Sequence, residues 1–147
     1  MRGISAIGHV AIRVKDVART LAFYSDRLGF TELMRLNRDG RLWLLYLRIT
    51  DDQYLEVFPD AEGERAPPRE ANGLNHLCLT VDDLDDVIAQ LAEHGVPLSQ
   101  AKKVGPDGNL QAWIEDPDGN RIELMQMAPD GLQLQAIRRL ARSRATS

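Results

Sequence analysis

The feature that most constrains the fold of this chain is an internal repeat with an offset of 67 residues. His9 recurs as His76 and Glu56 recurs as Glu123, each within a similar stretch: GHVAI against NHLCL, and YLEVF against RIELM. Solenoid and array repeats are shorter than this period, so the repeat indicates a duplicated module. We therefore expect two copies of one supersecondary unit, each supplying one histidine and one glutamate.

The first module, residues 4–58, shows a β-α-β-β-β pattern. Asp16 is a typical helix N-cap, and Gly29 is a typical residue at which a helix ends. Alternating β-branched residues predict strands on either side of that helix. The expected elements are a strand at 4–14, a helix at 17–28, and strands at about 31–37, 41–49 and 53–58.

The same pattern returns in the second module, residues 74–127. Between the modules, the polar segment 59–73 with Pro67-Pro68 at its centre predicts a linker. A C-terminal helix or tail is expected at 130–147. The second module should contain a strand at 74–81, a helix after Asp83 that ends at Gly95, and strands near 98–103, 109–115 and 121–127. The predicted fold class is therefore α+β.

The repeated histidines and glutamates predict a metal site. Side chains alternate between the two faces of a strand, so each of these four residues points away from the apolar side chains that would pack under a helix. A lone histidine or glutamate on a strand is usually structural or solvent-facing, but two of each at one offset are hard to obtain by chance. Imidazole and carboxylate are the common ligands of Ni, Zn, Co, Mn and Fe. We predict one divalent ion bound by His9, Glu56, His76 and Glu123.

Composition narrows the function classes. The chain has 147 residues and a formal net charge of −4, so it offers no basic field for nucleic acid. It contains no apolar run of about 20 residues that would cross a bilayer, which predicts no membrane partner. The N-terminus shows no signal-peptide pattern, and the single cysteine, Cys78, suits a reducing compartment. These features predict a cytoplasmic protein.

Four stretches carry a resemblance to a known family: HVAIRV at 9–14, FYSDRLGF at 23–30, NHL at 75–77 and DPDGNRIEL at 116–124. Together they resemble the vicinal oxygen chelate superfamily, which includes glyoxalase I, methylmalonyl-CoA epimerase, extradiol dioxygenases and fosfomycin- and bleomycin-resistance proteins. The resemblance implies that the two modules form a cup-shaped mixed sheet around a metal. The metal positions of the family fall on the same four residues.

The set of four ligands indicates which class of enzyme in this superfamily the chain resembles. Dioxygenases and fosfomycin-resistance enzymes of the family have no ligand at the position of Glu56, so a complete set resembles glyoxalase I-type isomerases and lyases. The implied substrate is a small carbonyl compound with two adjacent oxygens that reacts through an enediolate-like intermediate. The resemblance implies Glu123 as the base, with Glu56 second. An extradiol-type dioxygenase and a non-catalytic protein that binds a small molecule such as an antibiotic remain the alternatives.

The resemblance also concerns partners. Arg13 matches a position that holds a glutathione carboxylate in glyoxalase I, which makes it the expected substrate-binding residue. The segment after Glu56 and the residue after the DPDG turn, Asn120, differ from glutathione-dependent members, so glutathione remains one candidate among other small-molecule substrates. Each module supplies half of the ligands and an open sheet edge, and such edges are usually covered. We therefore expect a homodimer in which a module of one chain completes the cup of the other, although the linker at 59–73 also permits the two modules of one chain to pair.

Overall fold

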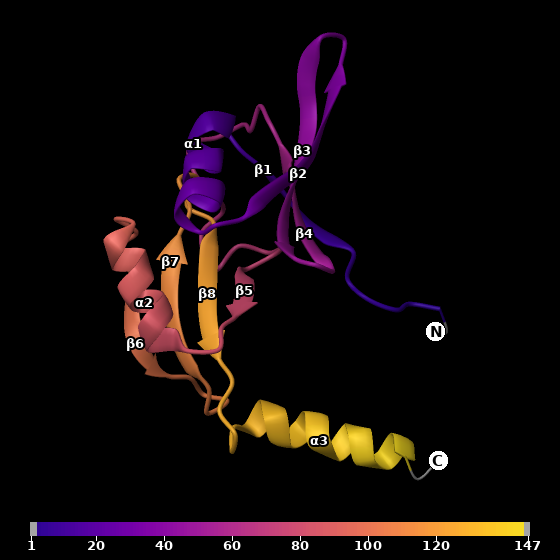
Figure 1. Cartoon of the computed structure of the whole chain (residues 1–147), viewed down its shortest axis with the longest axis vertical. Helices are drawn as coiled ribbons and strands as arrows, with labels where there is room; N and C mark the ends of the chain where they lie inside the picture. Colours follow the sequence, from indigo (N-terminus) through magenta and orange to yellow (C-terminus); the bar gives the residue numbers. More distant parts are fainter. Residues whose placement is uncertain (1–2, 146–147) are drawn as a thin grey trace. The chain divides into compact units, whose positions relative to one another are not determined.

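The computed structural model describes residues 3–145, which divide into two compact units. Within the described residues, the first unit comprises 3–66 and 116–118, and the second comprises 67–115 and 119–145. Each unit contains one four-stranded sheet of mixed strand direction together with helices, which confirms the predicted α+β class (Figure 1).

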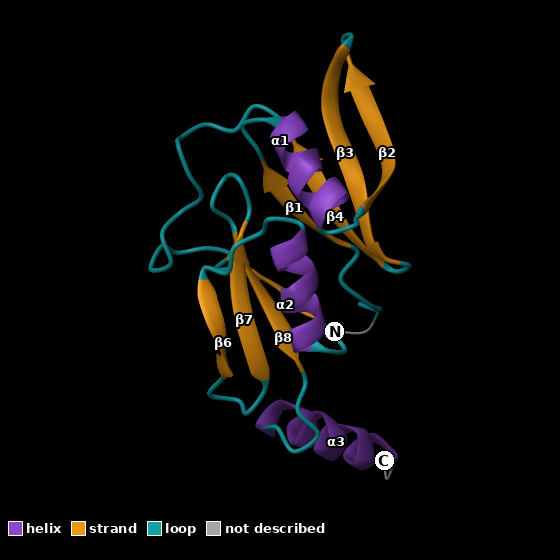
Figure 2. Cartoon of the chain, turned by 60° about the vertical axis from the view of Figure 1, so that its left-hand side comes forward, coloured by secondary structure: helices purple, strands orange, loops and turns teal. Residues whose placement is uncertain are grey.

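The first unit follows the predicted β-α-β-β-β order (Figure 2). In its sheet the strands lie in the order β1-β4-β3-β2, with β1 parallel to β4 and the other neighbours antiparallel. A parallel pair requires a crossover connection, and the chain between β1 and β4 runs through α1, η1, β2 and β3. The elements are β1 His9–Arg13, α1 Val17–Leu21, the π-helix η1 Ala22–Arg27, β2 Thr31–Arg38, β3 Arg41–Thr50 and β4 Gln53–Phe58.

Two details of the first unit differ from the sequence prediction. Strand β1 begins at His9 and not at residue 4, and the alternating residues Ile4 and Ile7 are 75% and 76% exposed. Alternation alone predicted a strand there, but the ladder with β4 begins only at His9. The single helix expected at 17–28 changes at residue 22 to a π-helix, with the Leu28 amide bonded to the Phe23 carbonyl. Gly29 follows it with φ +76°, as expected of a glycine that ends a helix.

The core of the first unit lies on one face of its sheet. Leu45, Leu47, Leu55 and Val57 are fully buried, and register pairs Leu45 with Val57 and Leu47 with Leu55. Burying a side chain of this size contributes roughly 1.5–3 kcal/mol, which fixes the face that points inward. Glu56, between two of these residues, therefore points to the opposite face. The alternation predicted from sequence is confirmed here.

The second unit repeats the arrangement, with strand order β5-β8-β7-β6 and β5 parallel to β8. Helix α2 packs on β7 and β8 and buries Leu84 and Leu91. Its N-cap is Asp83, as predicted, because the Asp83 carboxylate accepts the amides of Asp85 and Asp86. The elements are β5 Leu77–Thr80, α2 Leu84–Glu93, β6 Gln100–Val104, β7 Leu110–Glu115, β8 Arg121–Gln126 and α3 Leu132–Ala145.

Strand β5 is shorter than predicted. It begins at Leu77 instead of residue 74, because its pairing with β8 starts at Leu77 and Ile122. His76 therefore stands one residue before the strand, in the segment that leads into it. Residues 59–76 contain no helix or strand.

Helix α3 forms most of the segment predicted at 130–147; residues 146–147 of that prediction lie outside the described part of the chain. The fully buried Asn109 ties its start to the sheet. The Asn109 side-chain amide donates to Gln133 Oε1 at 2.8 Å, and its Oδ1 accepts the Ala128 amide at 2.9 Å. No helix within residues 3–145 has the length and apolar character needed to cross a membrane.

The Asp116-Pro117-Asp118-Gly119 turn belongs to the first unit through residues 116–118. The buried Tyr24 hydroxyl donates to Asp116 Oδ2 at 3.0 Å, and the Lys15 amide donates to Asp118 Oδ2 at 3.0 Å. Within the turn, the Asp118 amide donates to Asp116 Oδ1 at 2.9 Å. The predicted turn is present, and its carboxylates hold the helix and the strand end of the first unit.

Candidate metal half-sites

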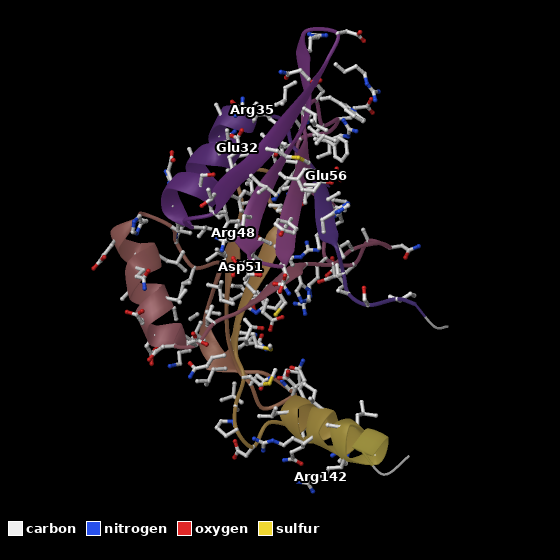
Figure 3. All side chains as sticks on the ribbon, turned by 45° about the vertical axis from the view of Figure 1, so that its right-hand side comes forward. Glu32, Arg35, Arg48, Asp51, Glu56 and Arg142 are labelled. Atoms are coloured by element: carbon white, nitrogen blue, oxygen red, sulfur yellow. The ribbon has the colours of Figure 1, made fainter. Side chains whose placement is uncertain are left out.

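The first half-site is a histidine–glutamate pair on neighbouring parallel strands. His9 is the first residue of β1. Glu56 lies in β4, and its register partner is Ala11 of β1. His9 Nε2 lies 3.3 Å from Glu56 Oε2. The Glu56 residue is only 9% exposed, whereas the His9 side chain is 45% exposed. Figure 3 labels Glu56 on the first unit. Such a buried carboxylate needs a partner of opposite charge or several hydrogen-bond donors.

Tyr46 on β3 supplies one of those donors. It is the register partner of Glu56, and its hydroxyl donates to Glu56 Oε1 at 2.7 Å. This hydrogen bond is the main reason that the pKa of Tyr46 is raised. The Tyr46 ring also meets His9 edge-on, with ring centroids 5.5 Å apart. Tyr46 is not among the site residues predicted from the sequence.

The second half-site has the same plan. His76 Nε2 lies 3.0 Å from Glu123 Oε2, and Glu123 lies in β8. The register partner of Glu123 on β7 is Trp113, whose ring meets His76 edge-on with centroids 4.8 Å apart. Tyr46 and Trp113 are themselves separated by the repeat offset of 67 residues, which is the signal that could have revealed both. The indole N–H of Trp113 donates to Gln111 Oε1 at 2.9 Å.

Asn75 sets the tautomer of His76. The Asn75 side-chain amide donates to the Arg69 carbonyl at 2.7 Å, which identifies the other atom, Oδ1, as the acceptor. Oδ1 lies 3.0 Å from His76 Nδ1, so Nδ1 must carry the hydrogen. In neutral His76 the lone pair is then on Nε2, the atom that faces Glu123. A histidine ligand typically has its second ring nitrogen fixed in this way.

With this tautomer, His76 Nε2 can act as a ligand of a metal ion. A neutral imidazole lone pair and a carboxylate oxygen are both acceptors, and two acceptors do not approach to 3.0 Å without a cation between or beside them. The cation is either a proton on the imidazole or a metal ion. Two adjacent ligands about 2.1 Å from one ion lie about 3.0–3.4 Å apart. The two pairs, at 3.3 and 3.0 Å, have this spacing, so the donor chemistry of each half-site fits a divalent ion.

The two pairs lie in different units of the chain. Within residues 3–145 no three His, Cys, Asp or Glu side chains are gathered into a group that could hold a metal ion. The structure thus shows each predicted histidine beside its predicted glutamate. The binding of one ion by His9, Glu56, His76 and Glu123 together stays a prediction.

Arg13, the predicted substrate-binding residue, lies at the end of β1 on the same face as His9. Its Nη1 donates to the Pro59 carbonyl at 2.8 Å, and its guanidinium carbon lies 5.2 Å from the centre of the Phe58 ring. The side chain is therefore held in place while it remains exposed. An arginine offers five N–H donors, so the ones not used by Pro59 can bind a carboxylate. Substrate binding by Arg13 remains a prediction.

Cys78 is the register partner of Glu123 on β5. Burial of its thiol, followed by the nearby Glu123 carboxylate, raises the pKa of Cys78 to about 12. The thiol is thus protonated at neutral pH in the metal-free protein. The repeat places Ala11 at the corresponding position of the first unit, so this thiol distinguishes the second half-site from the first.

Comparison with known proteins extends these findings. A "Lactoylglutathione lyase" of Pseudomonas aeruginosa is 30% identical over 155 residues, covering 84% of this chain and 83% of the relative. The "Uncharacterized protein YaeR" of Escherichia coli (strain K12) is 34% identical over 128 residues, covering 86% of this chain and 99% of the relative. The crystal structure of a glyoxalase family protein from Enterococcus faecalis is similar with a TM-score of 0.73 and 34% identity, covering 82% of this chain and 96% of that one.

The sequence profile of one family covers most of the chain. The Glyoxalase/Bleomycin resistance protein/Dioxygenase superfamily matches residues 6–124, a range that includes all four predicted ligands and Arg13. This superfamily is the one that the sequence motifs resemble, and the two β-α-β-β-β units agree with its fold. The chain therefore belongs to the Glyoxalase/Bleomycin resistance protein/Dioxygenase superfamily.

Proposed function

We propose that this protein is a metal-dependent lyase or isomerase that acts on a small carbonyl substrate with two adjacent oxygens. His9, Glu56, His76 and Glu123 would together hold one divalent ion. The observation that carries the proposal is the pair of equivalent His–Glu half-sites, in one of which Asn75 Oδ1 lies 3.0 Å from His76 Nδ1 and Glu123 Oε2 lies 3.0 Å from His76 Nε2. Placing a carboxylate beside an imidazole nitrogen costs free energy unless a cation is present. With a metal ion, the two groups become adjacent ligands.

The residues of the chain have separate roles in this proposal. A bound divalent ion supplies a Lewis acid that polarises substrate oxygens. The Glu123 carboxylate would accept the proton from the carbon that bears the hydroxyl and return it to the adjacent carbonyl carbon, while the hydroxyl proton passes to the former carbonyl oxygen, so that the isomerisation needs no oxidant. Glu56 is the second candidate for this base. Because the Tyr46 hydroxyl already bonds one of its oxygens, Glu56 is less free to turn than Glu123.

Arg13 would orient an anionic part of the substrate. Its exposed guanidinium is held by the Pro59 carbonyl and the Phe58 ring, so little side-chain freedom remains to be lost on binding. A carboxylate-bearing thiol adduct of a 2-oxoaldehyde suits both Arg13 and the proposed base. The similarity to a lactoylglutathione lyase supports this substrate class.

The test combines metal analysis with a substrate panel. Purified protein is depleted with a chelator, reloaded separately with Zn, Ni, Co, Mn or Fe, and assayed against adducts of 2-oxoaldehydes with glutathione and with smaller thiols. Turnover supported by redox-inactive Zn or Ni, without oxygen uptake, is the expected result. Turnover that requires Fe or Mn and consumes oxygen would establish a dioxygenase instead. Tight ligand binding that is indifferent to chelation, without turnover, would establish a binding protein.

A substitution tests the role of the base. Glu123→Gln keeps an oxygen that can coordinate but cannot accept a proton, so turnover should fall by about 10² or more while metal occupancy changes much less. Glu56→Gln is the matched comparison from the other half-site. Unchanged turnover in the Glu123 variant, with a large loss in the Glu56 variant, would reverse the assignment.

A further inference from the structure

The two half-sites are built from equivalent positions but differ in one hydrogen bond. In each, the residue opposite the glutamate on the neighbouring antiparallel strand is aromatic and meets the histidine edge-on. Tyr46 has a hydroxyl that reaches Glu56 at 2.7 Å. Trp113, the counterpart of Tyr46, directs its N–H to Gln111 instead. The repeat therefore gives one glutamate a strong donor that the other does not receive from the same position.

We propose that Tyr46 is a positioning residue that fixes Glu56 as a metal ligand. This inference rests on the proposed metal site. The phenol occupies Oε1 of Glu56 and leaves Oε2, the oxygen beside His9, as the coordinating atom. Rotation of the Glu56 carboxylate would break a hydrogen bond to a charged group, which is among the stronger kinds in proteins.

The surroundings of Tyr46 and Glu123 support the asymmetry. Register places Tyr46 beside Glu56, on the strand that leads to the turn where the ion pair between Arg48 and Asp51, labelled in Figure 3, lies. The position of the phenol is therefore set by the sheet. Glu123 has Cys78 as its other register neighbour, and a thiol is a weak donor. The carboxylate of Glu123 can thus turn at a lower cost than that of Glu56.

Tyr46→Phe tests the hydroxyl alone, because it removes that group and keeps the ring beside His9. Zn and Co(II) affinities would be measured by competition with a chromophoric chelator, and the visible absorption of the Co(II)-loaded protein would report the ligand geometry. We expect affinity to fall about 10- to 100-fold, as for other residues that orient a ligand, together with a changed Co(II) spectrum. The matched control is Tyr54→Phe, which removes a hydroxyl that donates to the Asp51 carbonyl in the same unit. It should leave affinity and spectrum unchanged.

A double-mutant cycle separates positioning from a general effect on folding. If Tyr46 acts through the Glu56 carboxylate, Tyr46→Phe should lower the affinity of wild-type protein but have little further effect in Glu56→Ala. Equal losses in both backgrounds, or wild-type affinity and spectrum in Tyr46→Phe, would overturn the proposal. A wild-type protein that binds neither metal would instead refute the proposed function. The two failures are therefore distinguishable.

Discussion

Replacing Asn75 by alanine should weaken metal binding although Asn75 itself is not a ligand. The Asn75 Oδ1 atom accepts the His76 Nδ1–H at 3.0 Å, and the Asn75 side-chain N–H donates to the Arg69 carbonyl at 2.7 Å. Without that acceptor, the hydrogen can move to Nε2, the atom that faces Glu123. A neutral hydrogen bond contributes about 1 kcal/mol, which corresponds to a factor of about 5 in the population of the ligating tautomer. Loss of ring orientation adds to this, so we expect affinity to fall about 10-fold or more.

Two measurements follow from this reasoning. Nitrogen NMR of the metal-free protein with its imidazoles neutral should show His76 as the Nδ1–H tautomer in wild type and a mixture in Asn75→Ala. Competition titration with a chelator should show the affinity loss in the same variant. Asn72→Ala, an exposed asparagine of the same segment, is the control and should match wild type. An Nε2–H tautomer in the wild-type protein, or unchanged affinity in Asn75→Ala, would refute the reasoning.

Three further predictions concern stability, reactivity and assembly. Tyr24→Phe removes the buried hydrogen bond to Asp116 and should lower the free energy of unfolding by about 2 kcal/mol and the melting temperature by about 5 °C. An unchanged melting curve would show that this hydrogen bond contributes nothing to stability. Because the pKa of Cys78 is about 12, alkylation of the metal-free folded protein at pH 8 should be about 10³-fold slower than for a thiol of pKa 9.0. The rate should rise with pH, and alkylation at the rate of the urea-unfolded chain would contradict this prediction. Sedimentation should show a metal-loaded dimer at tens of micromolar that weakens on chelation, and a monomer in both states would refute the expected homodimer.

Much of the fold was predictable because local signals agree with the repeat. Asp83 caps α2 as predicted, and the hairpin between β2 and β3 turns at Asp39 and Gly40, whose φ angles are +52° and +75°. Positive φ at both central residues is the geometry that an Asp-Gly pair favours in a hairpin. Side-chain alternation likewise placed Glu56 opposite the buried face of its sheet.

The other features depend on which residues of neighbouring strands pair, and the side-chain pattern within one strand does not determine this. Ile4 and Ile7 alternate like strand residues, yet the β1–β4 ladder starts only at His9. The role of Tyr46 follows from the register between β3 and β4, which alternation within either strand leaves undetermined. The role of Asn75 follows from a bond to Arg69 in an irregular segment. Each His–Glu pair was predictable from the repeat, whereas the residues that orient it required the structure.

X-ray absorption spectroscopy of the zinc-loaded protein, together with the metal stoichiometry, shows whether one ion is held by two histidines and two glutamates. We predict one ion per chain, with two imidazole ligands and further oxygen ligands at about 2.0–2.2 Å. Replacing either His9 or His76 by alanine should remove one imidazole from that shell. Two ions per chain, each with a single imidazole, or a shell without imidazole, would contradict it.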